Sequence, residues 1–244
     1  GRVPLLMPCT WIDGWPILGD ENGKVPFSGK ISLKPHPVNS HIVESDEFSS
    51  SKLKKCWQWN HNPLNEYWSL TECPGYLRLK TNKVVGSLYA ARNTITQRME
   101  GPTCQGTVAF NHSEMKNGDV AGFCAFNGHS GLLSIIKDGE TKYLTMSTNV
   151  VHLSNKEKAI LDVEVDEKER VELNSDIVYL RINCDFNLNR DIASFYYSLD
   201  NENWTKIGED FQMRFDYQKL FMGTRFALFN YATKETGGYV DVDF

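Results

Sequence analysis

Residues 120–147 read VAGFCAFNGHSGLLSIIKDGETKYLTMS, which is three short apolar runs separated by turn residues. The runs are 120–127, 131–137 and 143–147, and Lys137-Asp138-Gly139 supplies a tight turn before the third. None of the runs has the 3.6-residue recurrence of apolar side chains that marks an amphipathic helix. The stretch therefore predicts consecutive β-strands.

The same pattern extends in both directions, from Val43 to Phe244. Many short strands at a spacing of roughly 10–15 residues are typical of an all-β sandwich or jelly roll. The other expected strands are 57–60, 76–80, 90–99, 104–110, 159–165, 178–185, 194–199, 204–207, 226–231 and 238–244. We therefore predict an all-β fold built as a sandwich.

The composition excludes several classes of protein. The 244 residues include 26 Lys and Arg and 31 Asp and Glu, so the formal net charge is −5. This mild acidity argues against a nucleic-acid partner, which requires a basic face, and fits a neutral partner better than a polyanion. No run of about 18 apolar residues exists, so we expect no membrane partner. The 6 Trp, 10 Tyr and 13 Phe exclude a disordered chain.

Three segments are expected along the chain. In residues 1–27, Pro and Gly interrupt short apolar stretches, which indicates one or two strands with tight turns. Residues 28–42 are expected to be a linker, because Lys34-Pro35-His36-Pro37 cannot continue a helix and fits poorly in a central strand. The sandwich is expected to occupy residues 43–244. The start lacks Met and a signal-peptide pattern, so it reads as internal and does not reveal the compartment.

No catalytic signature is present, because the sequence lacks G-x-S-x-G, H-E-x-x-H, a P-loop and G-x-G-x-x-G. Carboxylates can still converge from distant positions, but none is marked here as an acid or a nucleophile. We therefore expect no self-sufficient active site. The six cysteines contain no C-x-x-C pair, and reduced thiols are expected in a chain long enough to fold without disulfides, although the even number permits them.

A polar segment suggests sugar recognition. Residues 90–98 read AARNTITQR, which is polar on both faces of the expected strand. Amide, guanidinium and hydroxyl groups beside aromatic rings suit sugars, which carry many donors and acceptors and have apolar C–H faces. Each of these features also has an alternative without sugar. Residues 90–98 could be a solvated outer strand, Trp57 and Trp59 could belong to the core, and Asn230 could hold a neighbouring loop. The candidate sugar contacts are Trp59, His61, Arg92, Asn93, Gln97, Asn230 and Tyr231.

Acidic residues near both ends of the sandwich suggest a cation site. First and last strands commonly pair in sandwiches, which would bring Asp46 close to Asp243. Carboxylates together with backbone oxygens are suitable ligands for Ca²⁺. The alternative is that these acids lie on two exposed sheet edges and are simply solvated. We expect no required cofactor and name Asp46 and Asp243 as candidate Ca²⁺ ligands.

Several motifs together resemble the C-terminal sandwich of glycoside hydrolase family 43. They are WQWNHNP at 57–63, WSLTE at 68–72, PGYLRL at 74–79, ARNTITQR at 91–98, FYYSLD at 195–200 and FALFNYAT at 226–233. Enzymes of this family are β-xylosidases and α-L-arabinofuranosidases, which hydrolyse O-glycosyl bonds. The resemblance implies a concanavalin-like jelly-roll β-sandwich, similar to the xylan-binding module family 91.

The resemblance also implies a partner in the same polypeptide. Residues 8–16, PCTWIDGWP, resemble the closing segment of the family's five-bladed catalytic β-propeller, so residues 1–27 are expected to be its remnant. The catalytic carboxylates of the family lie on that propeller, and none carries over to this chain. The implied function is an accessory module that binds xylan or arabinoxylan oligosaccharide and supports the propeller, with the turn at 60–63 helping to shape its pocket. The alternative is a purely structural sandwich that binds no sugar.

Overall fold

The computed structural model describes residues 5–20, 22–26, 28–30, 32, 34, 43–216 and 220–244. The chain divides into two compact units, Gly1–Ser40 and His41–Phe244. Most of the predicted linker at 28–42 lies outside the described residues. In the first unit, β1 (Cys9–Ile12) and β2 (Trp15–Leu18) form an antiparallel hairpin. Asp13 and Gly14 both have positive φ, as a two-residue hairpin turn requires.

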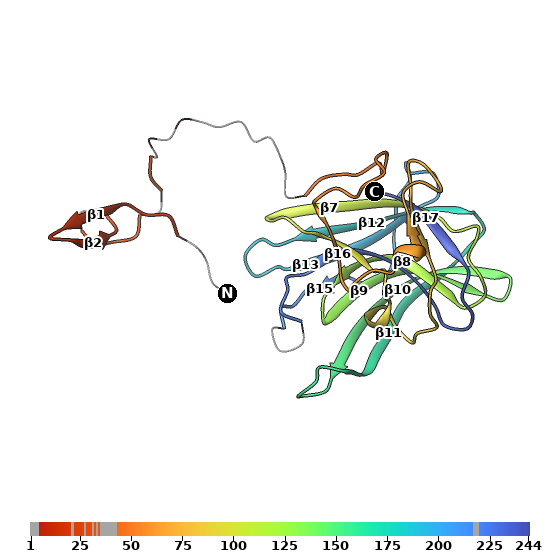
Figure 1. Ribbon diagram of the computed structural model, residues 1–244. Coiled ribbons are helices and arrows are strands. Elements are labelled where there is room, and N and C mark those ends of the chain that lie inside the picture. The colour runs from red at the N-terminus through yellow and green to blue at the C-terminus, as the bar shows by residue number, and fades with distance from the viewer. Residues whose placement is uncertain are drawn as a thin grey trace. The chain divides into compact units, whose positions relative to one another are not determined.

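The second unit is a sandwich of two antiparallel sheets, which confirms the predicted all-β jelly-roll fold (Figure 1). The seven-stranded sheet has the order β11-β10-β9-β8-β16-β6-β3. The eight-stranded sheet has the order β14-β13-β12-β7-β17-β5-β4, and its eighth strand, β15, lies off this path and pairs with β13. Among the described residues, helices are limited to two short 3₁₀ turns, η1 (Asn65–Tyr67) and η2 (Leu88–Ala90), and none is long and apolar enough to cross a bilayer.

Most strands lie close to the ranges that were expected from the sequence. The seven-stranded sheet contains β3 (Trp57–Trp59), β6 (Ile95–Arg98), β8 (Asp119–Phe126), β9 (His129–Asp138), β10 (Thr141–Leu153), β11 (Ile160–Leu173) and β16 (Arg225–Ala232). The eight-stranded sheet contains β4 (Trp68–Ser69), β5 (Leu77–Lys80), β7 (Thr103–Asn111), β12 (Ile177–Asp185), β13 (Ile192–Ser198), β14 (Thr205–Lys206) and β17 (Tyr239–Asp243). The short strand β15 (Phe211–Gln212) pairs with β13.

The main core lies between the two sheets. Alternate residues of β7 and β12, such as Phe110 and Ile182, point into it, while their neighbours point outward, as the two-residue period of a strand requires. Phe123 of β8 stacks on Phe226 of β16, with 5.3 Å between ring centroids.

A second apolar cluster covers the other face of the seven-stranded sheet and includes Phe126, Leu132 and Phe229. All eight residues of β8 are consequently buried. A strand that is covered on both faces carries a continuous apolar run instead of an alternating one, which accounts for the run at 120–126.

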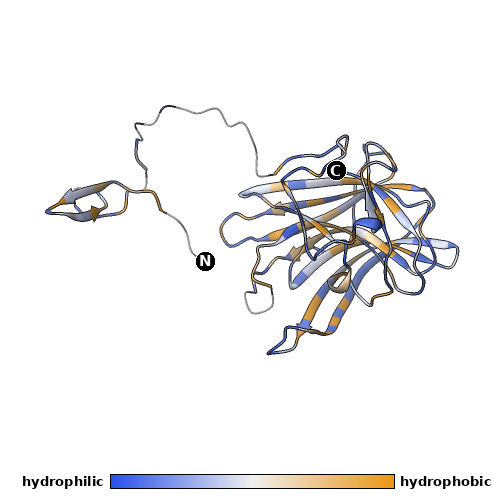
Figure 2. Ribbon diagram, viewed as in Figure 1, coloured by the Kyte–Doolittle hydropathy of each residue, from blue (hydrophilic) through white to orange (hydrophobic). Residues whose placement is uncertain are grey.

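Two expected strands differ in length from the prediction. The strand expected at 90–99 contains only β6, because the 3₁₀ turn η2 ends at Ala90 and the pairing with β16 begins at Ile95. The hairpin of β10 and β11 is longer than expected, and its far end extends beyond the neighbouring strands (Figure 1). Apolar and polar residues alternate along this hairpin (Figure 2), and most of β11 is exposed.

Candidate functional site

Three of the predicted sugar contacts are buried and hydrogen-bonded to the chain's own backbone. Asn93 is 3% exposed, and its carboxamide both accepts from Leu64 N–H (2.9 Å) and donates to the Leu64 carbonyl (3.0 Å). The Oε1 atom of Gln97 accepts from Glu44 N–H at 2.8 Å. Asn230 lies between the sheets, where its Nδ2 donates to the Leu79 carbonyl of β5 at 2.8 Å. In this structure these side chains fix loops and join the two sheets.

This placement corrects the interpretation of residues 90–98 as a polar surface strand. Thr94 and Thr96 are also buried, and the Thr96 hydroxyl donates to the Gln58 carbonyl at 2.9 Å. Most polar side chains of this segment are therefore buried and make contacts within the fold. Its exposed polar residues are Arg92 and Arg98.

Three other predicted contacts gather around the turn at 60–64. Trp59 is partly buried, with its ring 5.2 Å from that of Trp68. The Nε2 atom of His61 lies 3.0 Å from the Tyr89 carbonyl oxygen, and Arg92 Nη1 donates to the Asn62 carbonyl at 3.2 Å. The sugar contacts predicted at these residues stay predictions.

Tyr231 lies on β16 and packs against the second apolar cluster. It points to the opposite face of the strand from Asn230 and lies 6.1 Å from the ring of Phe229. Burial raises the pKa of Tyr231 to about 12, so its hydroxyl is protonated at neutral pH. Its sugar contact also stays a prediction.

The two candidate Ca²⁺ ligands lie near one another, because Asp46 N–H donates to the carbonyl of Phe244, the residue after Asp243 (2.7 Å). Both carboxylate oxygens of Asp46 are already occupied, by Phe48 N–H (3.0 Å) and by the Trp57 indole (2.9 Å). Burial and the nearby acids raise the pKa of Asp243. Among the described residues, no group of three or more His, Cys, Asp or Glu could hold a metal, and the Ca²⁺ site stays a prediction.

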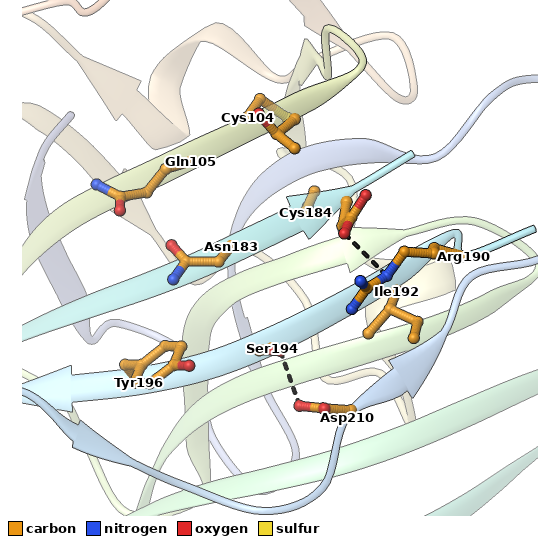
Figure 3. A pocket seen from close by; sticks show the side chains of 11 residues that line it. Cys104, Gln105, Asn183, Cys184, Arg190, Ile192, Ser194, Tyr196 and Asp210 are labelled. Atoms are coloured by element: carbon orange, nitrogen blue, oxygen red, sulfur yellow. Dashed lines mark hydrogen bonds and ion pairs between the residues drawn. The ribbon is translucent and has the colours of Figure 1, made fainter. Parts of the chain in front are cut away.

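The structure contains a hollow that the sequence did not reveal, on the outer face of the eight-stranded sheet (Figure 3). It has a volume of about 480 Å³ and lies over β7, β12 and β13. Gln105, Asn183 and Ser194 are direct cross-strand partners and form its central row. The other lining residues are Thr103, Cys104, Cys184, Asp185, Arg190, Ile192, Tyr196 and Asp210.

Asn183 gives this hollow an unsatisfied acceptor. Its Oδ1 atom is buried and has no hydrogen-bond partner among the described residues. Leaving a buried acceptor unpaired costs about 1–3 kcal/mol, so a donor entering the hollow would be favoured there. The Oδ1 atom is not accessible to solvent in this conformation, so a ligand hydroxyl or a water molecule can supply that donor only when the Asn183 side chain rotates toward the hollow.

The rim of the hollow carries balanced charges. Arg190 Nε pairs with Asp185 Oδ2 at 2.9 Å, and the Ser194 hydroxyl donates to Asp210 Oδ1 at 2.7 Å (Figure 3). Asp210 is also paired with Lys206 at 2.7 Å, and these contacts lower the pKa of its carboxyl. The opposing charges neutralise one another, so the hollow favours a neutral polar ligand over an ion.

Aromatic side chains lie in the next row of the same face. Tyr196 is the cross-strand partner of Arg181, whose guanidinium lies 3.5 Å from the centroid of the Trp204 ring and donates to Thr107 Oγ1 at 3.0 Å. Rings beside amide and hydroxyl groups can contact the C–H faces of a sugar. The sequence of β12 and β13 shows only that buried apolar residues alternate with less buried ones, which marks a half-solvated face and not a site.

Comparison with known proteins identifies the chain. Residues 45–244 match the family described as the β-xylosidase C-terminal concanavalin A-like domain of GH43. The chain belongs to this family. The resemblance found in its sequence motifs is thereby confirmed.

Relatives of this GH43 C-terminal domain are larger proteins. A β-xylosidase from Formosa agariphila is 32% identical over 272 residues, and the match covers 100% of this chain but 42% of that protein. The solved structure of a bifunctional GH43-CE protein from Bacteroides eggerthii is 42% identical, with a TM-score of 0.85, and covers 100% of this chain and 30% of that one. The solved structure of an engineered GH43 glycoside hydrolase with endo-xylanase and exo-arabinofuranosidase activity is 31% identical, with a TM-score of 0.84. The match covers 100% of this chain and 48% of that one. The GH43 domain thus accounts for under half of each relative.

Proposed function

We propose that this GH43 domain is the C-terminal accessory module of a xylan- or arabinoxylan-degrading glycosidase, and that it binds xylo-oligosaccharide in the hollow over β7, β12 and β13. The observation that carries the proposal is the buried, unpaired Oδ1 of Asn183 within that hollow. A catalytic β-propeller of the same polypeptide is the proposed partner, which is consistent with relatives that are all larger than this chain.

The chemistry of the hollow suits a pentose polymer. After rotation of the Asn183 carboxamide toward the hollow, xylose hydroxyls can donate to its Oδ1 and exchange hydrogen bonds with the Gln105 carboxamide, while the Tyr196 ring offers an apolar surface. The volume of about 480 Å³ lies within the roughly 300–1,000 Å³ typical of small-molecule sites. Because the charged side chains on the rim are paired with one another, the hollow has little net charge to attract a charged ligand. The module would then hold xylan while the catalytic domain acts on it.

A structural role without sugar binding is the second candidate function. It is favoured by Asn93, Gln97 and Asn230, each of which hydrogen-bonds to backbone inside the fold, while Gln97 Nε2 and Asn230 Oδ1 have no partner among the described residues. In that case the sandwich buttresses the propeller, and the hollow is filled by water. The two functions differ in one measurable property, the affinity of the isolated chain for xylo-oligosaccharide.

Calorimetric titration of the chain with xylohexaose tests the proposal. We expect saturable binding with a Kd on the order of 0.1–1 mM, because a shallow, solvent-open site makes few fully desolvated contacts. Cellohexaose, which carries an additional hydroxymethyl group on each ring, is the matched control and should bind more weakly. Absence of heat with xylohexaose at millimolar concentration would support the structural role instead.

A further inference from the structure

Two cysteines lie directly opposite one another across neighbouring strands. In the register of β7 and β12, Cys104 is the Cα partner of Cys184. Directly opposed residues of an antiparallel pair have Cα atoms about 4.5–5.5 Å apart, and a disulfide requires about 4.4–6.8 Å. Figure 3 shows the two residues on adjacent strands at the end of the hollow. The backbone is therefore already in place for a cross-strand bridge.

The two thiols differ in access and in acidity. Cys104 is partly exposed, whereas Cys184 is 3% exposed and its thiol lies 3.7 Å from the Met99 sulfur. The neighbouring Cys184 thiol lowers the pKa of the Cys104 thiol, and the same proximity together with burial raises the pKa of Cys184. Cys104 is thus the thiol that is both reachable and more readily deprotonated.

The other cysteines have no such partner. In the described strands, Cys124 is opposite Ala227 and Leu132, and Cys9 is opposite Leu18. Burial raises the pKa of Cys124 well above its ordinary value, which makes that thiol inert. All six thiols are free in this structure, so the arrangement describes the reduced protein.

We propose that Cys104 and Cys184 form a cross-strand disulfide when the folded protein meets a low-molecular-weight disulfide such as oxidised glutathione. The Cys104 thiolate attacks one sulfur of that reagent, forming a mixed disulfide and releasing one glutathione thiolate. Cys184 then loses its proton to water, and its thiolate attacks the Cys104 sulfur and releases the second glutathione thiolate. Two protein thiols are oxidised and one glutathione disulfide is reduced.

The bridge would fix β7 to β12 at one end of the hollow. It would close a long loop that includes β8 to β11, which constrains the unfolded chain strongly. The inference does not depend on sugar binding, because it rests on strand register and thiol chemistry alone. Such a bridge would oxidise two of the thiols that were expected from the sequence to be reduced.

The test incubates the folded chain with oxidised glutathione or with dithiothreitol, then blocks the free thiols and analyses a non-reducing digest by mass spectrometry. We expect a peptide pair linked through Cys104 and Cys184, lighter by two hydrogen atoms than the reduced pair. The oxidised protein should melt roughly 5–15 °C higher than the reduced one. Cys73→Ser should leave both results unchanged, because Cys73 lies elsewhere in the fold.

Single variants at the pair separate native pairing from random oxidation. Cys104→Ser should abolish the linked peptide and the thermal shift, and Cys184→Ser should stop at the glutathione adduct of Cys104. The proposal is overturned if wild-type protein retains both thiols free, if it stops at the mixed disulfide, or if the linked pair appears only after denaturation. A linked pair with no rise in melting temperature would likewise contradict a bridge that fits the native geometry.

Discussion

Replacing Gly122 by alanine is expected to lower the free energy of unfolding by about 3 kcal/mol or more. Gly122 lies in the middle of β8, between β16 and β9. A Cβ atom there would overlap the Leu133 carbonyl oxygen and lie 2.9 Å from the ring of Phe229. Neither neighbour can withdraw easily, because one is strand backbone and the other is a fully buried ring. Urea denaturation monitored by Trp fluorescence measures the loss.

Gly86 provides the matched control for this substitution. A Cβ atom at Gly86 would meet nothing within 4 Å, so Gly86→Ala should change stability by less than about 1 kcal/mol. Equal stability of the two variants would contradict the close packing of β8 against β9 and β16. A loss confined to Gly122→Ala would support close packing of β8 against its two neighbouring strands.

The second large effect is a loss of stability in acid that depends on His112. This residue is fully buried, and neither ring nitrogen has a hydrogen-bond partner among the described residues. Burial, with a further contribution from Lys142, lowers the pKa of His112 to about 4. The unfolded chain takes up this proton near the ordinary pKa of about 6.5. Stability from His112 is therefore present above about pH 6.5 and is lost as the pH falls toward 4.

Between pH 7 and pH 5 this loss is about 2 kcal/mol. Asp119 opposes it, because burial raises the pKa of its carboxyl to about 6 and the folded protein then binds a proton more readily than the unfolded chain. Variants must therefore be compared with one another at both pH values. The fall in unfolding free energy should be about 2 kcal/mol smaller in His112→Gln than in the wild type. His152→Gln, at a half-exposed histidine, should behave like the wild type.

The fold was predictable because its signals are local. Two-residue alternation and turn residues identify strands such as β12 and β13, whichever strands they pair with. The extent of β6 was not predictable in the same way, because the side chains of Asn93 and Thr94 hydrogen-bond to the backbone of Leu64 and Ala91, and the sequence does not mark those partners. A polar residue in a strand gives no sign of whether its partner is solvent, a ligand or distant backbone.

The site was less predictable for the same physical reason. The partners of Gln97 and Asn230 are backbone groups far away in the sequence, at Glu44 and Leu79, and only the folded chain brings them together. The hollow combines Gln105, Asn183 and Ser194 through strand register. Register depends on the whole topology, so no single segment could indicate this row.

Calorimetric titration of Asn183→Ala with xylohexaose shows whether the hollow binds the sugar. We expect a melting temperature that is unchanged or higher, because an unpaired buried acceptor is removed, together with affinity at least about tenfold weaker. Arg92→Ala, at the turn around residues 60–64, is the control and should bind like the wild type. Full affinity in Asn183→Ala, with loss of affinity in Arg92→Ala, would contradict the account and place the sugar at that turn instead.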